Sequence, residues 1–85
     1  MKILYVEDDP TARSYIHKGL SESGFEVDVA EDGARGYELA STGAYDLLVL
    51  DVMLPERDGF ELLRQLREEG IATPALFLSA RSEVA

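Results

Sequence analysis

The 85 residues include eight basic and seventeen acidic side chains, and the net charge of −9 argues against direct nucleic-acid binding by this segment. Hydrophobic residues make up 46% of the chain, which is enough for one modest core, and the absence of cysteine excludes a disulfide or a cysteine zinc site. The chain has neither a signal-peptide core nor an apolar run long enough to cross a membrane, so we expect a cytoplasmic protein without a membrane partner.

The first two elements are predicted from a short apolar run and a helical repeat. Residues 3–6 are apolar without interruption, which is typical of a strand buried on both faces. A helix is expected over 10–23, with Asp9 as its N-cap and with Ile16 and Leu20 buried in the core. The chain therefore opens as a strand followed by an amphipathic helix.

The next two strands differ in polarity. Residues 25–30 alternate between apolar and polar side chains and include two acids, so this strand fits an edge of a sheet. A short helix over 34–42, which Gly36 weakens, leads to a third strand over 46–51 that is apolar except at its ends. The third strand is therefore expected near the sheet centre.

The last elements complete the alternation of strands and helices. A third helix over 58–70 turns Leu62, Leu63 and Leu66 toward the core, and residues 75–78 form a fourth strand. Right-handed crossovers turn this order into a parallel sheet covered on both faces. The predicted fold class is α/β, with an open, doubly wound parallel sheet.

Polar side chains follow each of the three most apolar strands. Glu7, Asp8 and Asp9 follow the first strand, Asp51 ends the third, and Ser79 follows the fourth. Each of them alone is also typical of a helix cap or a solvated loop, but together they are expected at one edge of the sheet, where ligands of such folds bind. Clustered carboxylates repel by on the order of several kcal/mol, so such a cluster either takes up protons or recruits a cation, and the sequence favours a hard cation such as Mg²⁺. The sequence therefore predicts a magnesium site with room for a phosphoryl group.

Three segments carry a resemblance that extends over the whole chain. They are ILYVEDD over 3–9, DVMLP over 51–55 with DG over 58–59, and LSAR over 78–81. With them the chain resembles the receiver domain of a bacterial two-component response regulator of the OmpR/PhoB type, in which a winged-helix DNA-binding domain follows the receiver. The resemblance implies a flavodoxin-like fold with strand order 2-1-3-4.

The resemblance also implies a role for each site residue. Asp51 would be the phosphoacceptor, and Mg²⁺ would be the cofactor, bound directly by Asp8, mainly through a water by Glu7, and by the backbone carbonyl of Met53. Ser79 would be the switch hydroxyl that turns toward the phosphoryl group. The implied partner is a sensor histidine kinase, whose phosphohistidine is the donor, and DNA would be bound only through an output domain outside this chain.

A complete receiver in this family continues into a fifth strand that ends in a lysine, and then into a final helix. The chain stops before them, so residues 1–85 are expected to form an incomplete receiver domain in which the fifth strand is absent. The edge of the fourth strand then lacks a partner. We expect a stable form to pair this edge with a second copy in a homodimer, to exchange elements with it, or to retain the missing residues.

Two other functions fit parts of the pattern. A phosphatase of the haloacid-dehalogenase type also uses an aspartate at a strand end, but it needs a second aspartate where Met53 stands, so a turnover enzyme is not expected. A truncated or degenerate receiver-fold interaction module without a working phosphorylation switch is the alternative to an active receiver. The presence of Glu7, Asp8 and Asp51 favours the active receiver.

The aromatic residues and the single histidine are predicted to have structural roles only. The four tyrosines, Tyr5, Tyr15, Tyr37 and Tyr45, are scattered and are expected to border the core. His17 lies within the first helix without a second histidine or cysteine near it, and we assign it no role.

Overall fold

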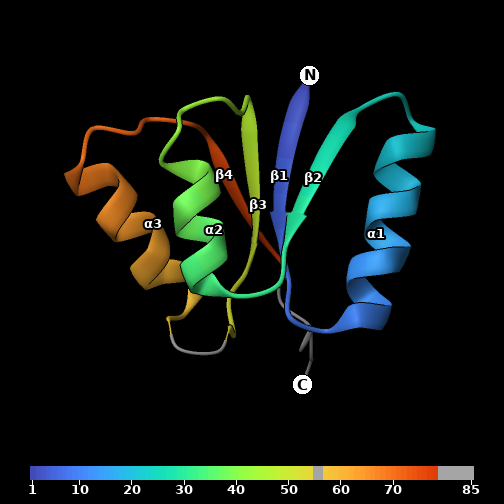
Figure 1. The fold of residues 1–85 in the computed structure, drawn as a ribbon, viewed down its shortest axis with the longest axis horizontal. Helices are drawn as coiled ribbons and strands as arrows, with labels where there is room; N and C mark the ends of the chain where they lie inside the picture. The colour runs from blue at the N-terminus through green and yellow to red at the C-terminus, as the bar shows by residue number, and fades with distance from the viewer. Residues whose placement is uncertain (55–56, 79–85) are drawn as a thin grey trace.

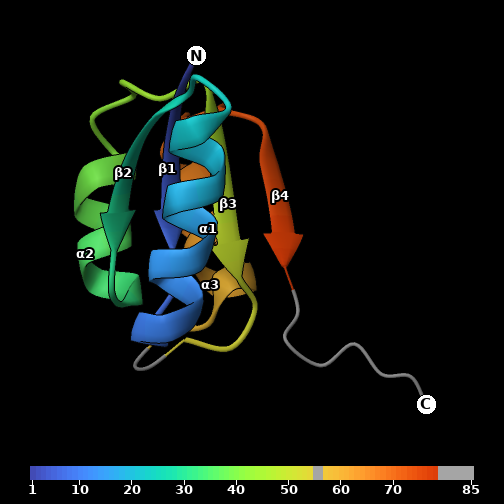
Figure 2. The same ribbon diagram turned by 90° about the vertical axis from the view of Figure 1, so that its right-hand side faces the viewer.

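The computed structural model describes residues 1–54 and 57–78, so Pro55 and Ser79 lie outside the described residues. Strands and helices alternate in the order β1 (Lys2–Val6), α1 (Pro10–Glu22), β2 (Glu26–Ala30), α2 (Gly33–Ala40), β3 (Leu47–Asp51), α3 (Gly59–Glu68) and β4 (Ala75–Leu78). All strand pairs are parallel, in the order β2-β1-β3-β4. Helix α1 covers one face of the sheet, and α2 and α3 cover the other (Figures 1 and 2). The predicted doubly wound sheet and its strand order are confirmed.

An aspartate precedes each of the three helices and caps it. Asp9, Asp32 and Asp58 occupy the N-cap positions, and their carboxylates accept backbone N–H groups of the first turns at 2.8 to 3.2 Å. The cap predicted at Asp9 is confirmed, and Pro10 occupies the start of α1, where its missing N–H costs nothing. None of the described helices has the length and apolar character that a membrane crossing requires.

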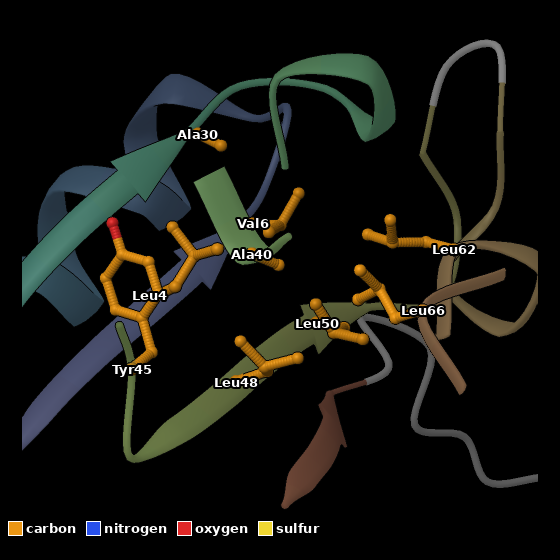
Figure 3. Packing of buried hydrophobic residues seen from close by; sticks show 9 residues of the cluster. All are labelled: Leu4, Val6, Ala30, Ala40, Tyr45, Leu48, Leu50, Leu62 and Leu66. Carbon is orange, nitrogen blue, oxygen red and sulfur yellow. The ribbon is translucent and has the colours of Figure 1, made fainter. Parts of the chain in front are cut away.

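The main core lies between the sheet and helices α2 and α3 (Figure 3). Its buried side chains are those of Leu4, Val6, Ala30, Ala40, Tyr45, Leu48, Leu50, Leu62 and Leu66. Even-numbered residues of β1 and β3 point to this face because successive side chains of a strand alternate. A Cβ on Gly36 would meet the Val6 methyl groups at 2.9 and 3.0 Å, so the glycine allows α2 to pack closely on β1.

The opposite face has a smaller core, because α1 is its only helix among the described residues. Its buried residues are Ile3, Tyr5 and Val49, against which Ile16, Leu20, Val27 and Leu47 pack. No residue of α1 is fully buried, so the predicted burial of Ile16 and Leu20 is wrong in degree: both are partly exposed. Leu63, expected in the core, is likewise only partly buried, in contrast to Leu62 and Leu66.

Strand β4 forms one edge of the described sheet (Figure 2). Phe77 points toward the main core, whereas Leu76 points to the α1 face and has 56% of its surface exposed. An unpaired edge was predicted for this strand. Its pairing with a second copy stays a prediction.

Candidate metal centre

Three acidic side chains meet at the carboxyl ends of β1 and β3. The register of the two strands pairs Val6 with Leu50, so that the next residues, Glu7 and Asp51, also lie side by side. One carboxylate oxygen from each of Glu7, Asp8 and Asp51 lies within 4.8 Å of the others. The fold therefore brings together three of the residues that the sequence singles out.

The other candidate residues have different positions. Asp9 caps α1 and does not belong to the three-residue cluster. Met53 follows β3 with an exposed side chain, and its N–H donates to Asp51 Oδ1 at 3.3 Å. A role for its carbonyl in binding a metal stays a prediction, as does the role of Ser79, which lies outside the described residues.

Two of the three clustered carboxylates are buried. Glu7 is 7% exposed and Asp51 is 5% exposed, whereas Asp8 is open to solvent. Burial raises the pKa of Glu7, and the neighbouring Asp51 adds to this rise through a hydrogen bond and its charge, while the Asp9 N–H opposes it. Buried carboxylates in contact favour either a shared proton or a bound cation. The centre is thus suited to a positive charge.

Glu7 is held in place by three hydrogen bonds. Its N–H donates to Ala30 O at 3.0 Å, which extends the β1–β2 pairing by one residue. The Tyr5 hydroxyl donates to Oε1 and the Asp9 N–H donates to Oε2, both at 3.1 Å. Tyr5 was not among the residues predicted for the site. The signal for this contact in the sequence is the spacing, because a residue two positions before Glu7 on a strand shares its face.

Arg13 holds the loop that carries the acids. Its Nη1 donates to the backbone carbonyl of Glu7 at 2.9 Å and is 3.4 Å from that of Asp8. The guanidinium therefore ties the first turns of α1 to the end of β1. Arg13 is not predicted as part of the site, because a contact from a helix back to the preceding loop has no signature in the apolar repeat.

The Asp58–Gly59 pair fixes the other side of the centre. Asp58 caps α3, and the N–H of Gly59 donates to Val52 O at 2.9 Å. A Cβ on Gly59 would collide with the backbone carbonyl of Asp51, so only glycine allows α3 to start against the end of β3. This contact gives a physical reason for the DG segment in the sequence.

Comparison with known proteins establishes the class to which this fold and centre belong. The family described as the response regulator receiver domain matches residues 3–85, so the chain belongs to that family. SilR of Salmonella typhimurium, a probable transcriptional regulatory protein, is 51% identical over 80 residues, and the transcriptional regulatory protein CusR of Escherichia coli K12 is 49% identical over 80 residues. Each match covers 94% of this chain and 35% of the relative, so the chain spans about a third of their length.

Solved structures show the same fold. The Francisella response regulator 1452 receiver domain has a TM-score of 0.90 and 38% identity, and the match covers 96% of this chain and 68% of that one. The response regulator TrrA from Thermotoga maritima, solved in complex with Mg²⁺ and BeF, has a TM-score of 0.88 and 33% identity, with 95% of this chain and 70% of that chain covered. The predicted receiver fold is therefore confirmed.

Proposed function

We propose that this receiver domain accepts a phosphoryl group on Asp51, with Mg²⁺ bound by the neighbouring acids and with a sensor histidine kinase as the donor. The observation that carries the proposal is the meeting of Glu7, Asp8 and Asp51 within 4.8 Å at the ends of two central strands. Asp51 is the member of this group that ends a strand. The Met53 N–H donates to its Oδ1, and Gly59 at the start of α3 lies close to its backbone carbonyl.

The donor set fits Mg²⁺. All its side-chain ligands are carboxylate oxygens, which hard cations prefer, and two of them are buried where positive charge relieves their repulsion. In the proposal Asp8 and Asp51 bind the ion directly, Glu7 binds mainly through a water, and the Met53 carbonyl completes the protein's share. When bound, Mg²⁺ supplies charge neutralisation for the phosphoryl oxygens that approach Asp51.

The proposed reaction moves one phosphoryl group between two side chains. A carboxylate oxygen of Asp51 bonds to phosphorus, the phosphorus–nitrogen bond of the kinase phosphohistidine breaks, and its electron pair stays on the imidazole. The Met53 N–H orients the Asp51 carboxylate by holding Oδ1, which favours attack in line with the leaving nitrogen. The product stays on the chain, so we propose a phosphoacceptor and not a turnover enzyme.

The output of the switch is part of the same proposal. SilR and CusR are transcriptional regulators, of whose length this chain spans 35%. We propose that phosphorylation acts on transcription in the cytoplasm, with Ser79 as the switch hydroxyl and through a DNA-binding region outside residues 1–85. The net charge of −9 supports a receiver that does not itself bind DNA.

Phosphorylation by a small donor tests the role of Asp51. Because the chain spans 68% of a solved receiver chain, the experiment uses a protein that carries this sequence within a complete receiver domain. With acetyl phosphate and Mg²⁺, intact-mass measurement should show one phosphoryl group on the parent and none on Asp51→Asn. Asp46→Asn is the matched control, since Asp46 precedes β3 at its other end, where it accepts the Lys2 N–H.

Two results would contradict the assignment. One is phosphorylation that persists in Asp51→Asn, and the other is phosphorylation of the parent that is undiminished by a chelator. A parent that takes up no phosphoryl group at all would instead favour the interaction module without a working switch.

Substitution of asparagine for Asp8 and, separately, for Asp9 tests which exposed acid of the loop binds the metal. Asp8→Asn should weaken Mg²⁺ binding by about tenfold or more, because it removes a direct charged ligand. Asp9→Asn should leave the affinity nearly intact, because Asp9 caps α1 and asparagine is an equally good cap. Titration calorimetry measures both dissociation constants, and equal losses from the two substitutions would contradict this division of roles.

A further inference from the structure

Tyr5 connects the small apolar core beneath α1 with the acidic centre. It is 1% exposed and packs in the small core beneath α1 with Ile3 and Val49. Its ring lies in that apolar cluster, whereas its hydroxyl reaches the end of β1 and donates to Glu7 Oε1 at 3.1 Å. The hydroxyl is the donor in this contact, because a carboxylate can only accept.

We propose that Tyr5 is a positioning residue of the metal centre and that its hydroxyl fixes the orientation in which the Glu7 carboxylate faces Mg²⁺. The inference rests on the proposed function. The Glu7 carboxylate receives one donor on each oxygen, the Tyr5 hydroxyl on Oε1 and the Asp9 N–H on Oε2. The last torsion of a glutamate is broad, so a single donor leaves the carboxylate free to turn, whereas two donors define its plane.

This arrangement leaves Glu7 able to serve the metal. A carboxylate oxygen has a second lone pair after it accepts one hydrogen bond, so both oxygens can still face the ion or its water. The donor from Asp9 is a backbone N–H of the loop, so the exchange of Tyr5 does not remove it. The Tyr5 hydroxyl is therefore the part of the arrangement that a single side-chain change removes, and phenylalanine fills the same volume without it.

Magnesium and calcium should respond differently to the loss of this donor. Mg²⁺ demands nearly ideal octahedral geometry, whereas Ca²⁺ accepts flexible and variable coordination. A carboxylate that turns freely should therefore lower the affinity for Mg²⁺ more than the affinity for Ca²⁺. A purely structural role for Tyr5 would not change the ratio of the two affinities, so this ratio is the informative readout.

The experiment compares two tyrosine-to-phenylalanine variants of the protein with a complete receiver domain. Tyr5→Phe should raise the Mg²⁺ dissociation constant about tenfold, as is typical for the loss of a partner that orients a ligand, and should raise that of Ca²⁺ less. Tyr45→Phe is the matched control, because the Tyr45 hydroxyl also donates to a carboxylate, that of Asp28 at 2.7 Å, which is not in the acidic cluster. It should leave both constants unchanged. Titration calorimetry gives the constants, and unfolding without metal is followed for both variants.

A double-mutant cycle tests whether Tyr5 acts through Glu7. In a Glu7→Ala background, Tyr5→Phe should have no further effect on Mg²⁺ binding, because the acceptor is gone. The proposal is overturned if Tyr5→Phe weakens Mg²⁺ binding less than twofold, if it weakens the binding of Mg²⁺ and Ca²⁺ equally, or if its effect on Mg²⁺ binding persists in the Glu7→Ala background. In those cases the parent still binds Mg²⁺ and the proposed function stands. A parent that binds no Mg²⁺ would overturn both.

Discussion

The face of the sheet beneath α2 and α3 is closed by two helices, whereas the opposite face is covered by α1 alone among the described elements (Figure 1). Leu62 and Leu66 of α3 are completely buried, but no residue of α1 is. Glycine at position 36 also brings α2 close to β1. Most of the buried apolar surface, and with it most of the stabilising free energy, is therefore on the α2/α3 face.

The acidic centre lies at the end of the thinly covered face. Side chains alternate along a strand, so Glu7 follows Tyr5 and Asp51 follows Val49 on the side that α1 covers. The dense core on the other side holds β1 and β3 in register, and at the end of the α1 face Asp8 is open to solvent beside the buried Glu7 and Asp51. The α2/α3 face thus provides most of the packing that holds the strands, and the acidic centre lies on the α1 face.

The same substitution on the two faces tests this division most strongly. Leu62→Ala should lower the free energy of unfolding by about 3 kcal/mol, since it leaves a cavity in the closed core. Leu20→Ala on α1 should cost only about 1 kcal/mol, because the side chain is already partly exposed and little of its contact is lost. Denaturant unfolding of the metal-free protein measures both. Equal losses would show that the two faces contribute alike.

A second pair of substitutions should change stability in opposite directions. Alanine in place of glycine favours a helix by about 1 kcal/mol when nothing opposes it. Gly19 in α1 has no atom within 4 Å of its hypothetical Cβ, so Gly19→Ala should stabilise the protein by about that amount. In Gly36→Ala the new methyl group would be 2.9 Å from a methyl group of Val6, and overpacking of about 1 to 3 kcal/mol should outweigh the helix preference. Stabilisation by both variants would contradict close packing of α2.

The regular elements could be predicted from the sequence because the continuous apolar runs of β1 and β3 are typical of buried parallel strands. The ends of α2 could not. The helix was expected over 34–42 but ends at Ala40, because the hydroxyls of Ser41 and Thr42 bond to backbone carbonyls of the last turn and Gly43 adopts a φ of 73°. Such local competition between side chain and backbone is weakly encoded in an apolar repeat.

The acids of the centre could be predicted because the carboxyl ends of parallel strands share one edge of the sheet. The contacts that support them are encoded less clearly. Tyr5 counts as an apolar residue in a strand pattern, and only its spacing of two residues from Glu7 points to their hydrogen bond. Arg13 counts as a polar residue of a helix, so its hydrogen bond to the loop is visible only in the fold. The helical repeat likewise shows which side of α1 meets the sheet, but not that a single helix leaves Ile16 and Leu20 partly exposed.

The smallest expected effect is the change in the free energy of unfolding with pH that the buried Glu7 causes. Burial raises the pKa of Glu7 above its ordinary value of 4.5, so near that pH the folded chain binds the proton more tightly than the unfolded chain. The contribution of Glu7 to stability is therefore fully present below about pH 4.5 and is lost as the pH rises through the folded pKa. In contrast to the Leu62 core, this end of the sheet becomes less stable on approach to neutral pH.

Glu7→Gln should remove this loss, because the amide carries no charge at any pH. The measurement is the free energy of unfolding against pH, from below 4.5 to 7, with a chelator present so that no cation offsets the charge. The slope, rather than the absolute value, is decisive, since glutamine also changes the hydrogen bonds from Tyr5 and Asp9 at every pH. Glu26→Gln, an exchange at an exposed position of β2, is the matched control and should keep the parent's slope. A parent slope that survives in Glu7→Gln would show that burial of Glu7 does not cause it.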